Sequence, residues 1–355
     1  MITLVLTYRN RDLRIAENCL NSLAQQSEKD FRVILVDYGS DPLFAMGIVN
    51  TVSKYDFVTL ISCPTHEQLW SKCRSINIAL RQTTTPYFLV GDIDLMFHPD
   101  FIKISLEHAA ENVVYFQYGF LSEKESLQQK DFEAYKVDFL GSKEVTGTTL
   151  FPTNKLSEVH GYDEFYHGWG AEDTDIHIRL RNLGLKVDFY NKSVLVKHQW
   201  HPKEYRSKTS DKPFHSHLER VNNRYMLLTR SSCRTRVNLD GEWGYMPDNT
   251  VYNRLNNKAD EQLMLEPINF EVSALFAQLK NYKGEIVSVT IIAADRKKKI
   301  IQNIKKVLKK KYLTMLPMET VNNLLLEEII KNYRNIPYAY KFDRRNKVIK
   351  LTLVF

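Results

Sequence analysis

Two aspartates at the end of a short apolar run are the clearest chemical feature of this sequence. Residues 87–90 read YFLV between Pro86 and Gly91, and Asp92 and Asp94 follow with one isoleucine between them. An apolar run with such boundaries is typical of a buried strand. Because open α/β sheets bind ligands at the carboxyl ends of their strands, we expect both carboxylates to face one cleft.

Two carboxylates this close repel each other, and burying both is costly unless a cation lies beside them. A hard divalent ion, Mn²⁺ or Mg²⁺, prefers oxygen ligands and keeps positions open for substrate phosphates. A nucleoside diphosphate is therefore a sensible ligand. The alternative for a lone D-x-D is a capped turn with solvated aspartates, so the surrounding residues must distinguish the two.

The elements around this motif alternate between strand and helix. Ahead of it we expect strand 2–7, helix 12–26, strand 31–36, strand 57–61 and helix 69–80. After it we expect helix 101–111, strand 113–118, strand 145–151, a helix from 172 to about 183, and strands 186–190 and 194–197. This order predicts an α/β fold whose mostly parallel sheet has helices on both faces.

Polar side chains suited to a nucleotide follow the predicted strands. Arg9 and Arg11 come after the first strand, where guanidinium groups can stack on a base or hold phosphates. Asp37 ends the second strand and can accept from a base or ribose. Lys72 and Arg74 lie in the helix before the acidic strand. Singly, each is more often a solvated surface residue, but their recurrence at strand ends favours a binding site.

A second acidic stretch lies further along the chain. Gly168 and Gly170 flank Trp169, and Glu172 and Asp173 follow where a helix should begin. Acidic residues in a first turn are also explained by the helix dipole.

His198 ends a short predicted strand. A lone histidine there is usually a surface residue, whereas beside an acidic motif it is a candidate metal ligand.

The combination of these motifs resembles the metal-dependent, GT-A fold glycosyltransferases of the family 2 type, over about residues 2–202. The resemblance rests on Asp37, the D-x-D at 92–94, G-Y-D-E at 161–164, G-W-G-x-E-D at 168–173 and His198. Residues 7–11 (TYRNR) and 169–173 (WGAED) are also similar to β-1,4-galactosyltransferases and bacterial chondroitin-polymerase-like enzymes.

The resemblance implies an inverting transfer of a hexose or N-acetylhexosamine from a UDP-sugar to a saccharide acceptor, in polysaccharide or lipid-linked glycan synthesis. The expected donor-binding residues are Thr7, Tyr8, Arg9, Arg11, Asp37, Lys72, Arg74, Asp92 and Trp169. The expected ligands of Mn²⁺ or Mg²⁺ are Asp94, His198 and Asp92. The expected acceptor-binding residues are Trp169, Glu172 and Asp173, with Asp173 as the general base.

Two departures from the family pattern bear on these roles. Tyr38 stands where many members have a second acidic residue, which weakens the assignment of base recognition to Asp37. Leu195 stands where vertebrate galactosyltransferases place a metal-binding Met, which leaves the choice between Mn²⁺ and Mg²⁺ open.

Composition indicates a folded protein with room for a large and a smaller domain, with 43% hydrophobic residues in 355. No stretch has the roughly 20 consecutive apolar residues that cross a bilayer, and no charged segment precedes an apolar run at the N-terminus. The four cysteines show no close metal-ligand spacing. We therefore expect a cytoplasmic protein.

The basic charge is concentrated near the C-terminus. The net charge is +7, yet residues 295–350 hold 16 Lys and Arg against five Asp and Glu. A strand at 286–293, helices at 296–312 and 319–333, and a hairpin over 338–355 predict a small α+β module. We expect three parts: a GT-A domain over 1–235, a connecting region over 236–280 and the basic module over 281–355.

Helix 296–312 has apolar residues on one side and lysines on the other. We expect the apolar side to pack on the module's own sheet, with the lysines in solvent. The alternative is peripheral contact with an anionic membrane surface near a lipid-linked acceptor.

Another class of function is a non-catalytic scaffold on a degenerate transferase fold, which binds a membrane or a polyanion through the basic module. For the enzyme, the expected partners are the donor and acceptor rather than a nucleic acid. A phosphohydrolase is a weaker alternative because it leaves the G-W-G-x-E-D motif and His198 unexplained.

Overall fold

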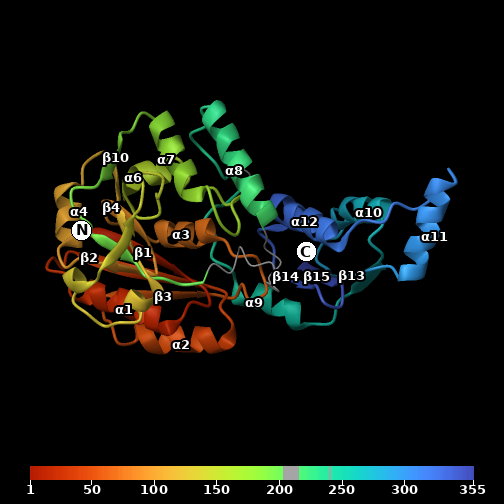
Figure 1. The fold of residues 1–355 in the computed structure, drawn as a ribbon, viewed down its shortest axis with the longest axis horizontal. Helices are drawn as coiled ribbons and strands as arrows, with labels where there is room; N and C mark the ends of the chain where they lie inside the picture. The colour runs from red at the N-terminus through yellow and green to blue at the C-terminus, as the bar shows by residue number, and fades with distance from the viewer. Residues whose placement is uncertain (203–215, 240) are drawn as a thin grey trace. The chain divides into compact units, whose positions relative to one another are not determined.

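The computed structural model describes residues 1–202, 216–239 and 241–355 (Figure 1). Within them the chain folds into two compact units. The first comprises residues 1–63, 70–202, 219–239 and 241–246, and the second comprises 64–69, 216–218 and 247–355.

A seven-stranded sheet forms the centre of the first unit, in the order β10-β6-β9-β4-β1-β2-β3. Its strands are β1 (Ile2–Tyr8), β2 (Phe31–Tyr38), β3 (Val58–Cys63), β4 (Tyr87–Asp92), β6 (Val113–Phe116), β9 (Thr149–Pro152) and β10 (Val187–Tyr190). Only β9 runs antiparallel to its neighbours within this sheet. The predicted mostly parallel α/β sheet is therefore confirmed.

Both faces of this sheet are buried because successive side chains of a strand point to opposite sides. Leu4 and Leu6 enter one apolar core, and Val5 between them enters the other. The first core includes residues of α1 (Leu13–Ala24), α2 (Pro42–Val52) and α4 (Phe101–Glu107). The second includes residues of α3 (Lys72–Arg81), α6 (Thr153–Glu158), α7 (Glu172–Asn182) and α8 (Ser216–Ser231).

Capping side chains set where two of these helices start. The Asp12 carboxylate accepts from the backbone N–H of Arg14 at the start of α1. Ser71 does the same for Arg74, so α3 begins at Lys72 rather than at residue 69. The sequence does not predict α2, which is uncharged and lacks a clear amphipathic pattern.

A second sheet of the first unit has the order β5-β11-β7-β8. Its strands are β5 (Leu95–Phe97), β7 (Tyr118–Leu121), β8 (Val137–Leu140) and β11 (Val196–His198). The single strand expected at 113–118 is thus two strands in different sheets, separated at Gln117. Between β7 and β8 lie two short helices, α5 (Glu123–Ser126) and η1 (Phe132–Ala134).

The second unit is a small α+β fold around a sheet in the order β12-β13-β15-β14. The strands are β12 (Glu261–Leu265), β13 (Ile286–Ile292), β14 (Tyr338–Asp343) and β15 (Val348–Val354). Its helices are α9 (Asn249–Asn253), η3 (Arg254–Asn256), α10 (Asn269–Leu279), α11 (Arg296–Val307), α12 (Met318–Glu328) and η4 (Ile329–Tyr333). β12 and α10 come from the stretch in which we expected a connecting region.

The expected packing of the apolar side of α11 on this sheet is wrong. Ile304 and Val307 of that side are 53% and 81% exposed. The helical pattern was correct, but an amphipathic pattern does not specify which side is covered. Among the described residues, no helix is long and apolar enough to cross a membrane.

A fully buried ion pair ties α7 to the preceding loop. Arg179 donates from Nε to Asp175 at 2.7 Å and from Nη2 to the carbonyl of Gly161 at 2.8 Å. The Tyr166 hydroxyl donates to the other Asp175 oxygen at 3.0 Å. Because every partner is inside the core, removing one leaves a buried charge uncompensated.

We predict that Arg179→Met destabilises the protein by about 3–5 kcal/mol, because Asp175 is left buried without its cation. Urea denaturation measures this. The matched control is Arg181→Met, which removes an exposed arginine of the same helix and should cost less than about 0.5 kcal/mol. Equal losses in the two variants would show that the buried pair does not anchor α7.

Candidate active site

The carboxyl ends of three adjacent strands meet at one edge of the large sheet. In the β-sheet register Thr7 lies opposite Asp92, and Tyr8 lies opposite Asp37. The order β4-β1-β2 therefore brings the two predicted strand-end acids to either side of the Arg9–Arg11 segment.

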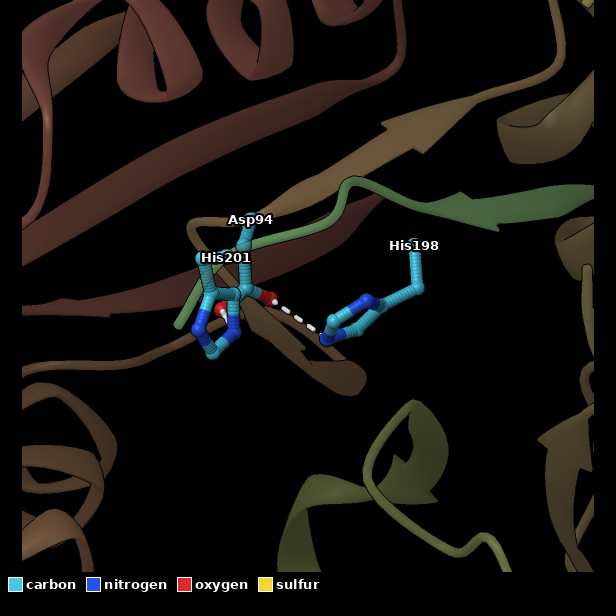
Figure 2. A group of neighbouring side chains, drawn as sticks. All are labelled: Asp94, His198 and His201. Carbon is cyan, nitrogen blue, oxygen red and sulfur yellow. Dashed lines mark ion pairs between the residues drawn. The ribbon is translucent and has the colours of Figure 1, made fainter. Parts of the chain in front are cut away.

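Asp94, His198 and His201 form what we call the histidine cluster. Asp94 lies in the turn between β4 and β5, and His198 ends β11, which pairs with β5. Nε2 of His198 is 3.6 Å from Asp94 Oδ1, and Nε2 of His201 is 3.1 Å from Asp94 Oδ2. One ligand atom from each residue lies within 4.8 Å of the others. Figure 2 shows both rings directed toward the carboxylate.

The charge states of the histidine cluster suit metal ligation. Burial alone would raise the pKa of Asp94, but His198, the hydrogen bond from His201 and the nearby Arg11 guanidinium together hold it below its usual value. Arg11 Nη2 lies 3.2 Å from Asp94 Oδ2. Burial lowers the pKa of His198 despite the opposing effect of Asp94. An ionised carboxylate and a neutral imidazole are the forms that bind a metal ion.

A divalent ion fits these residues. Asp94 Oδ1 is buried, and the described residues offer it no hydrogen-bond partner. One carboxylate and two imidazoles form a donor set for first-row divalent metals. The predicted metal cofactor is therefore supported. The sequence interpretation missed His201, although its spacing in H-Q-W-H next to the strand end was a usable signal.

Lys72, Asp92, Glu172 and Asp173 form what we call the lysine cluster. Lys72 Nζ lies 3.0 Å from Asp92 Oδ1, 2.9 Å from Asp173 Oδ2 and 4.0 Å from Glu172 Oε1. Asp92 thus contacts Lys72 and does not belong to the histidine cluster. Its assignment as a metal ligand stays a prediction.

Burial, and to a lesser extent the neighbouring carboxylates, shifts the pKa values in the lysine cluster. Burial opposes protonation of Lys72, yet Asp173, Asp92 and Glu172 together hold its pKa well above the ordinary value. Burial and the nearby carboxylates raise the pKa of Asp92 to about 6 and that of Glu172 to about 7, against the attraction of Lys72. The Lys72 ammonium group therefore does not fully offset the effects of burial and of the repulsion among the three carboxylates.

A strained loop presents the acids of α7. Gly168, Gly170 and Ala171 have φ angles of 76°, 100° and 77°. Ala171 has a Cβ, so this backbone is unfavourable by about 1 kcal/mol or more. The buried Asn222 of α8 holds the loop by donating to the carbonyls of His167 and Trp169 at 3.0 and 3.3 Å. Trp169 is 43% exposed at the surface of this loop.

The G-Y-D-E motif supports the site without belonging to it. Glu164 Oε1 accepts from Asn77 Nδ2 at 2.9 Å and from the backbone N–H of Gly244 at 2.7 Å. Gly161 has φ of +65°, and a Cβ there would lie 2.3 Å from Asn77 Oδ1. These contacts fix the loop before α7.

Gly147 is a site residue that sequence reasoning missed. A Cβ at this position would lie 2.7 Å from the hydroxyl of Tyr118 and 3.1 Å from Asp92 Oδ2. A side chain here would therefore enter the lysine cluster. A lone glycine in V-T-G-T-T gave no signal, because the close approach arises between segments far apart in sequence.

The remaining predicted donor residues are largely buried. Tyr8 is fully buried and donates from its hydroxyl to the carbonyl of Arg11 at 2.8 Å, so it orients the Arg11 segment. Asp37 accepts from the N–H and hydroxyl of Ser40 at 3.0 and 2.6 Å, and burial raises its pKa. Thr7 is 5% exposed and Arg74 is 3% exposed.

Two family comparisons match the part of the chain that carries these clusters. Glycosyl transferase family 2 matches residues 3–154, and the family described as the N-terminal domain of galactosyltransferase matches residues 129–202. No curated protein sequence matches the chain. The matched segments contain both halves of the site, so over residues 3–202 the chain is similar to glycosyltransferases of these two families.

Several solved structures are similar at low identity. S. aureus TarS residues 1–349 in complex with UDP-GlcNAc is 16% identical with a TM-score of 0.47, covering 65% of this chain and 69% of that chain. The mannosyltransferase PcManGT from Pyrobaculum calidifontis, in complex with GDP-Man and Mn²⁺, is 13% identical with a TM-score of 0.44, covering 94% and 87%. In two other comparisons the chain spans 60% of TarS 1–349 and 37% of the longer TarS.

We predict that Glu172→Gln stabilises the protein at pH 8 and not at pH 4. The folded-state pKa of Glu172 is raised from 4.5 to about 7, so its contribution to stability is lost as the pH rises through that window. The glutamine amide does not ionise, so the variant keeps this stability. We expect its free energy of unfolding at pH 8 to be about 1–3 kcal/mol higher than that of the wild type. Urea denaturation at both pH values tests it, with the exposed Glu144→Gln as control. A variant less stable than the wild type at pH 8 would contradict the raised pKa of Glu172.

Proposed function

We propose that the protein is an inverting, metal-dependent glycosyltransferase that moves a hexose or N-acetylhexosamine from a UDP-sugar to a saccharide acceptor. The observation that carries this proposal is the histidine cluster at the end of β4, with its three ligand atoms within 4.8 Å. We place the reaction in the cytoplasm, in the synthesis of a polysaccharide or lipid-linked glycan.

The histidine cluster would hold the metal ion through Asp94, His198 and His201. When bound, a divalent ion stabilises the negative charge that develops on a leaving diphosphate. Two imidazoles in the donor set favour Mn²⁺ over Mg²⁺, which prefers an all-oxygen shell.

The segment after β1 is suited to bind the donor nucleotide. Arg11 is half-buried beside Asp94, so its guanidinium can hold a phosphate next to the histidine cluster. Arg9 acts electrostatically on Asp37. The buried Asp37 carboxylate is fixed by Ser40, which supports a role in accepting from the uridine.

Asp173 is suited to be the general base. Its Oδ2 accepts from Lys72 at 2.9 Å, while Oδ1 is buried and has no hydrogen-bond partner among the described residues. An acceptor hydroxyl can donate to Oδ1 and then transfer its proton there as its oxygen bonds to the anomeric carbon and UDP departs. Trp169 would form a wall for the sugars, and Glu172 would bind an acceptor hydroxyl.

We predict that Asp173→Asn lowers kcat by about 100-fold or more, because the amide cannot accept the proton. Asp94→Ala and chelation by EDTA should each abolish turnover. UDP release from a panel of UDP-sugars with Mn²⁺ and saccharide acceptors measures this. Asp30→Asn is the matched control, since Asp30 is exposed and precedes the amino end of β2. Metal-independent turnover, or full activity of Asp173→Asn, would overturn the mechanism.

A scaffold on the same fold gives a different result. It would bind neither Mn²⁺ nor a nucleotide sugar, and no donor and acceptor pair would be turned over. The intact histidine cluster argues against such a loss of function.

We predict that His201→Ala weakens Mn²⁺ binding by at least about tenfold. The reason is that His201 supplies one of the three converging ligand atoms. Titration calorimetry without donor measures binding directly. Asp92→Asn tests the earlier assignment of Asp92, and the exposed His66→Ala is the control. If Asp92→Asn lowers affinity more than His201→Ala, Asp92 rather than His201 is the ligand.

A further inference from the structure

The apolar side of α11 is not covered by its own unit. Five residues at helical spacing form a continuous stripe along the helix and its C-cap, which we call the apolar stripe. Their exposures are 48% for Ile300, 42% for Ile301, 53% for Ile304, 81% for Val307 and 57% for Leu308. Soluble surfaces rarely carry contiguous apolar patches of this kind without a partner. In Figure 1 the ribbon of α11 stands apart from α12 and the strands of its unit.

The opposite, polar side of α11 attaches the helix to its unit. Gln302 is 7% exposed, and its Oε1 accepts from the backbone N–H of Leu313 at 2.8 Å. Lys298 forms an ion pair with Glu266 beside β12. The usual arrangement of a surface helix, with the apolar side inward, is therefore reversed.

Basic residues surround the apolar stripe. Between Asp295 and Lys311 the chain has nine Lys and Arg and a single acidic residue. At 100° per residue, Lys297 lies within the arc of the stripe at the first turn, Arg296 borders one edge and Lys305 borders the other. Lys309–Lys311 follow the helix end and are exposed. An apolar stripe bordered by cations is typical of helices that lie in a membrane interface.

We propose that α11 binds the surface of an anionic lipid membrane. The apolar stripe would enter the boundary between head groups and acyl chains, and the surrounding lysines would contact lipid phosphates. Charge complementarity favours lipid over a second copy of this chain, because pairing two such helices would bring eighteen like charges together. A nucleic acid would satisfy the lysines but would leave the apolar stripe in water.

The inference is independent of the sugar-transfer proposal, because lipid binding is measured without turnover. The test uses the full chain and vesicles of phosphatidylcholine, either alone or with 30% phosphatidylglycerol. We expect flotation with the anionic vesicles, at least about tenfold weaker binding to the neutral ones, and weakening at high salt. Equal binding to both vesicle types, or no binding to either, would overturn the proposal.

Two variants, one in α11 and one in the lysines that follow it, separate the apolar and the charged contributions. Ile301→Ser with Ile304→Ser and Val307→Ser should reduce anionic-vesicle binding by at least about tenfold. Lys309→Gln with Lys310→Gln and Lys311→Gln should reduce it comparably and remove most of the salt dependence. All six positions are exposed, so circular dichroism and the melting temperature should remain those of the wild type.

A matched control removes an apolar face that has no lysines. α2 exposes Leu43, Met46 and Val49 at 73%, 62% and 48% and contains no charged residue. The variant Leu43→Ser with Met46→Ser and Val49→Ser should bind vesicles like the wild type. If it loses binding equally, α11 is not the lipid-binding element. A different result would be that the wild type self-associates, whereas the α11 serine variant is monomeric and binds vesicles as the wild type does. In that case the apolar stripe is an interface between copies of the chain, and the lipid proposal is wrong.

Discussion

The buried position of Lys72 among three carboxylates is the constraint on which the rest of the site depends. Asp92 comes from the end of β4, whereas Glu172 and Asp173 come from the first turn of α7, and Lys72 begins α3. Without a cation between them, these acids would have to be protonated or exposed to water. Even with it, Asp92 and Glu172 have pKa values of about 6 and 7. The packing of α3 and α7 on the same face of the sheet is therefore also an electrostatic requirement.

The backbone just before α7 is strained, and contacts in the core stabilise it. Ala171 holds a left-handed backbone immediately before the helix, where most residues would be strained. One turn into the helix, the fully buried pair of Asp175 and Arg179 fixes the same segment to the carbonyl of Gly161. Strained residues persist only where the surroundings over-determine them. Here the buried ion pair and the Asn222 hydrogen bonds hold the strained backbone in place. As a result, the acids of the first turn are held against Lys72.

Sequence reasoning located the acids, Lys72 and His198 but not the contacts among them, for a physical reason. Strand-end carboxylates could be predicted because parallel strands end at one edge of a sheet, and local patterns reveal strands. The contact of Asp92 with Lys72, the participation of His201 and the close approach of Gly147 depend on distances between segments far apart in the chain. The same limit applies to α11. The spacing of its apolar residues predicted the helix. Which side of the helix is covered depends on the contact between Gln302 and Leu313, and no local sequence pattern reveals that contact.

The two aspartates of the D-x-D belong to two different clusters. Ile93 between them is 4% exposed and belongs to the apolar core, so the turn cannot rotate freely and the flanking carboxylates keep separate partners. Asp94 contacts Arg11 and the two histidines, on the side suited to a leaving diphosphate. Asp92 contacts Lys72, which also contacts the base candidate Asp173. One buried isoleucine thus links the positions of the histidine cluster and the lysine cluster, so a shift of this turn would disturb both at once.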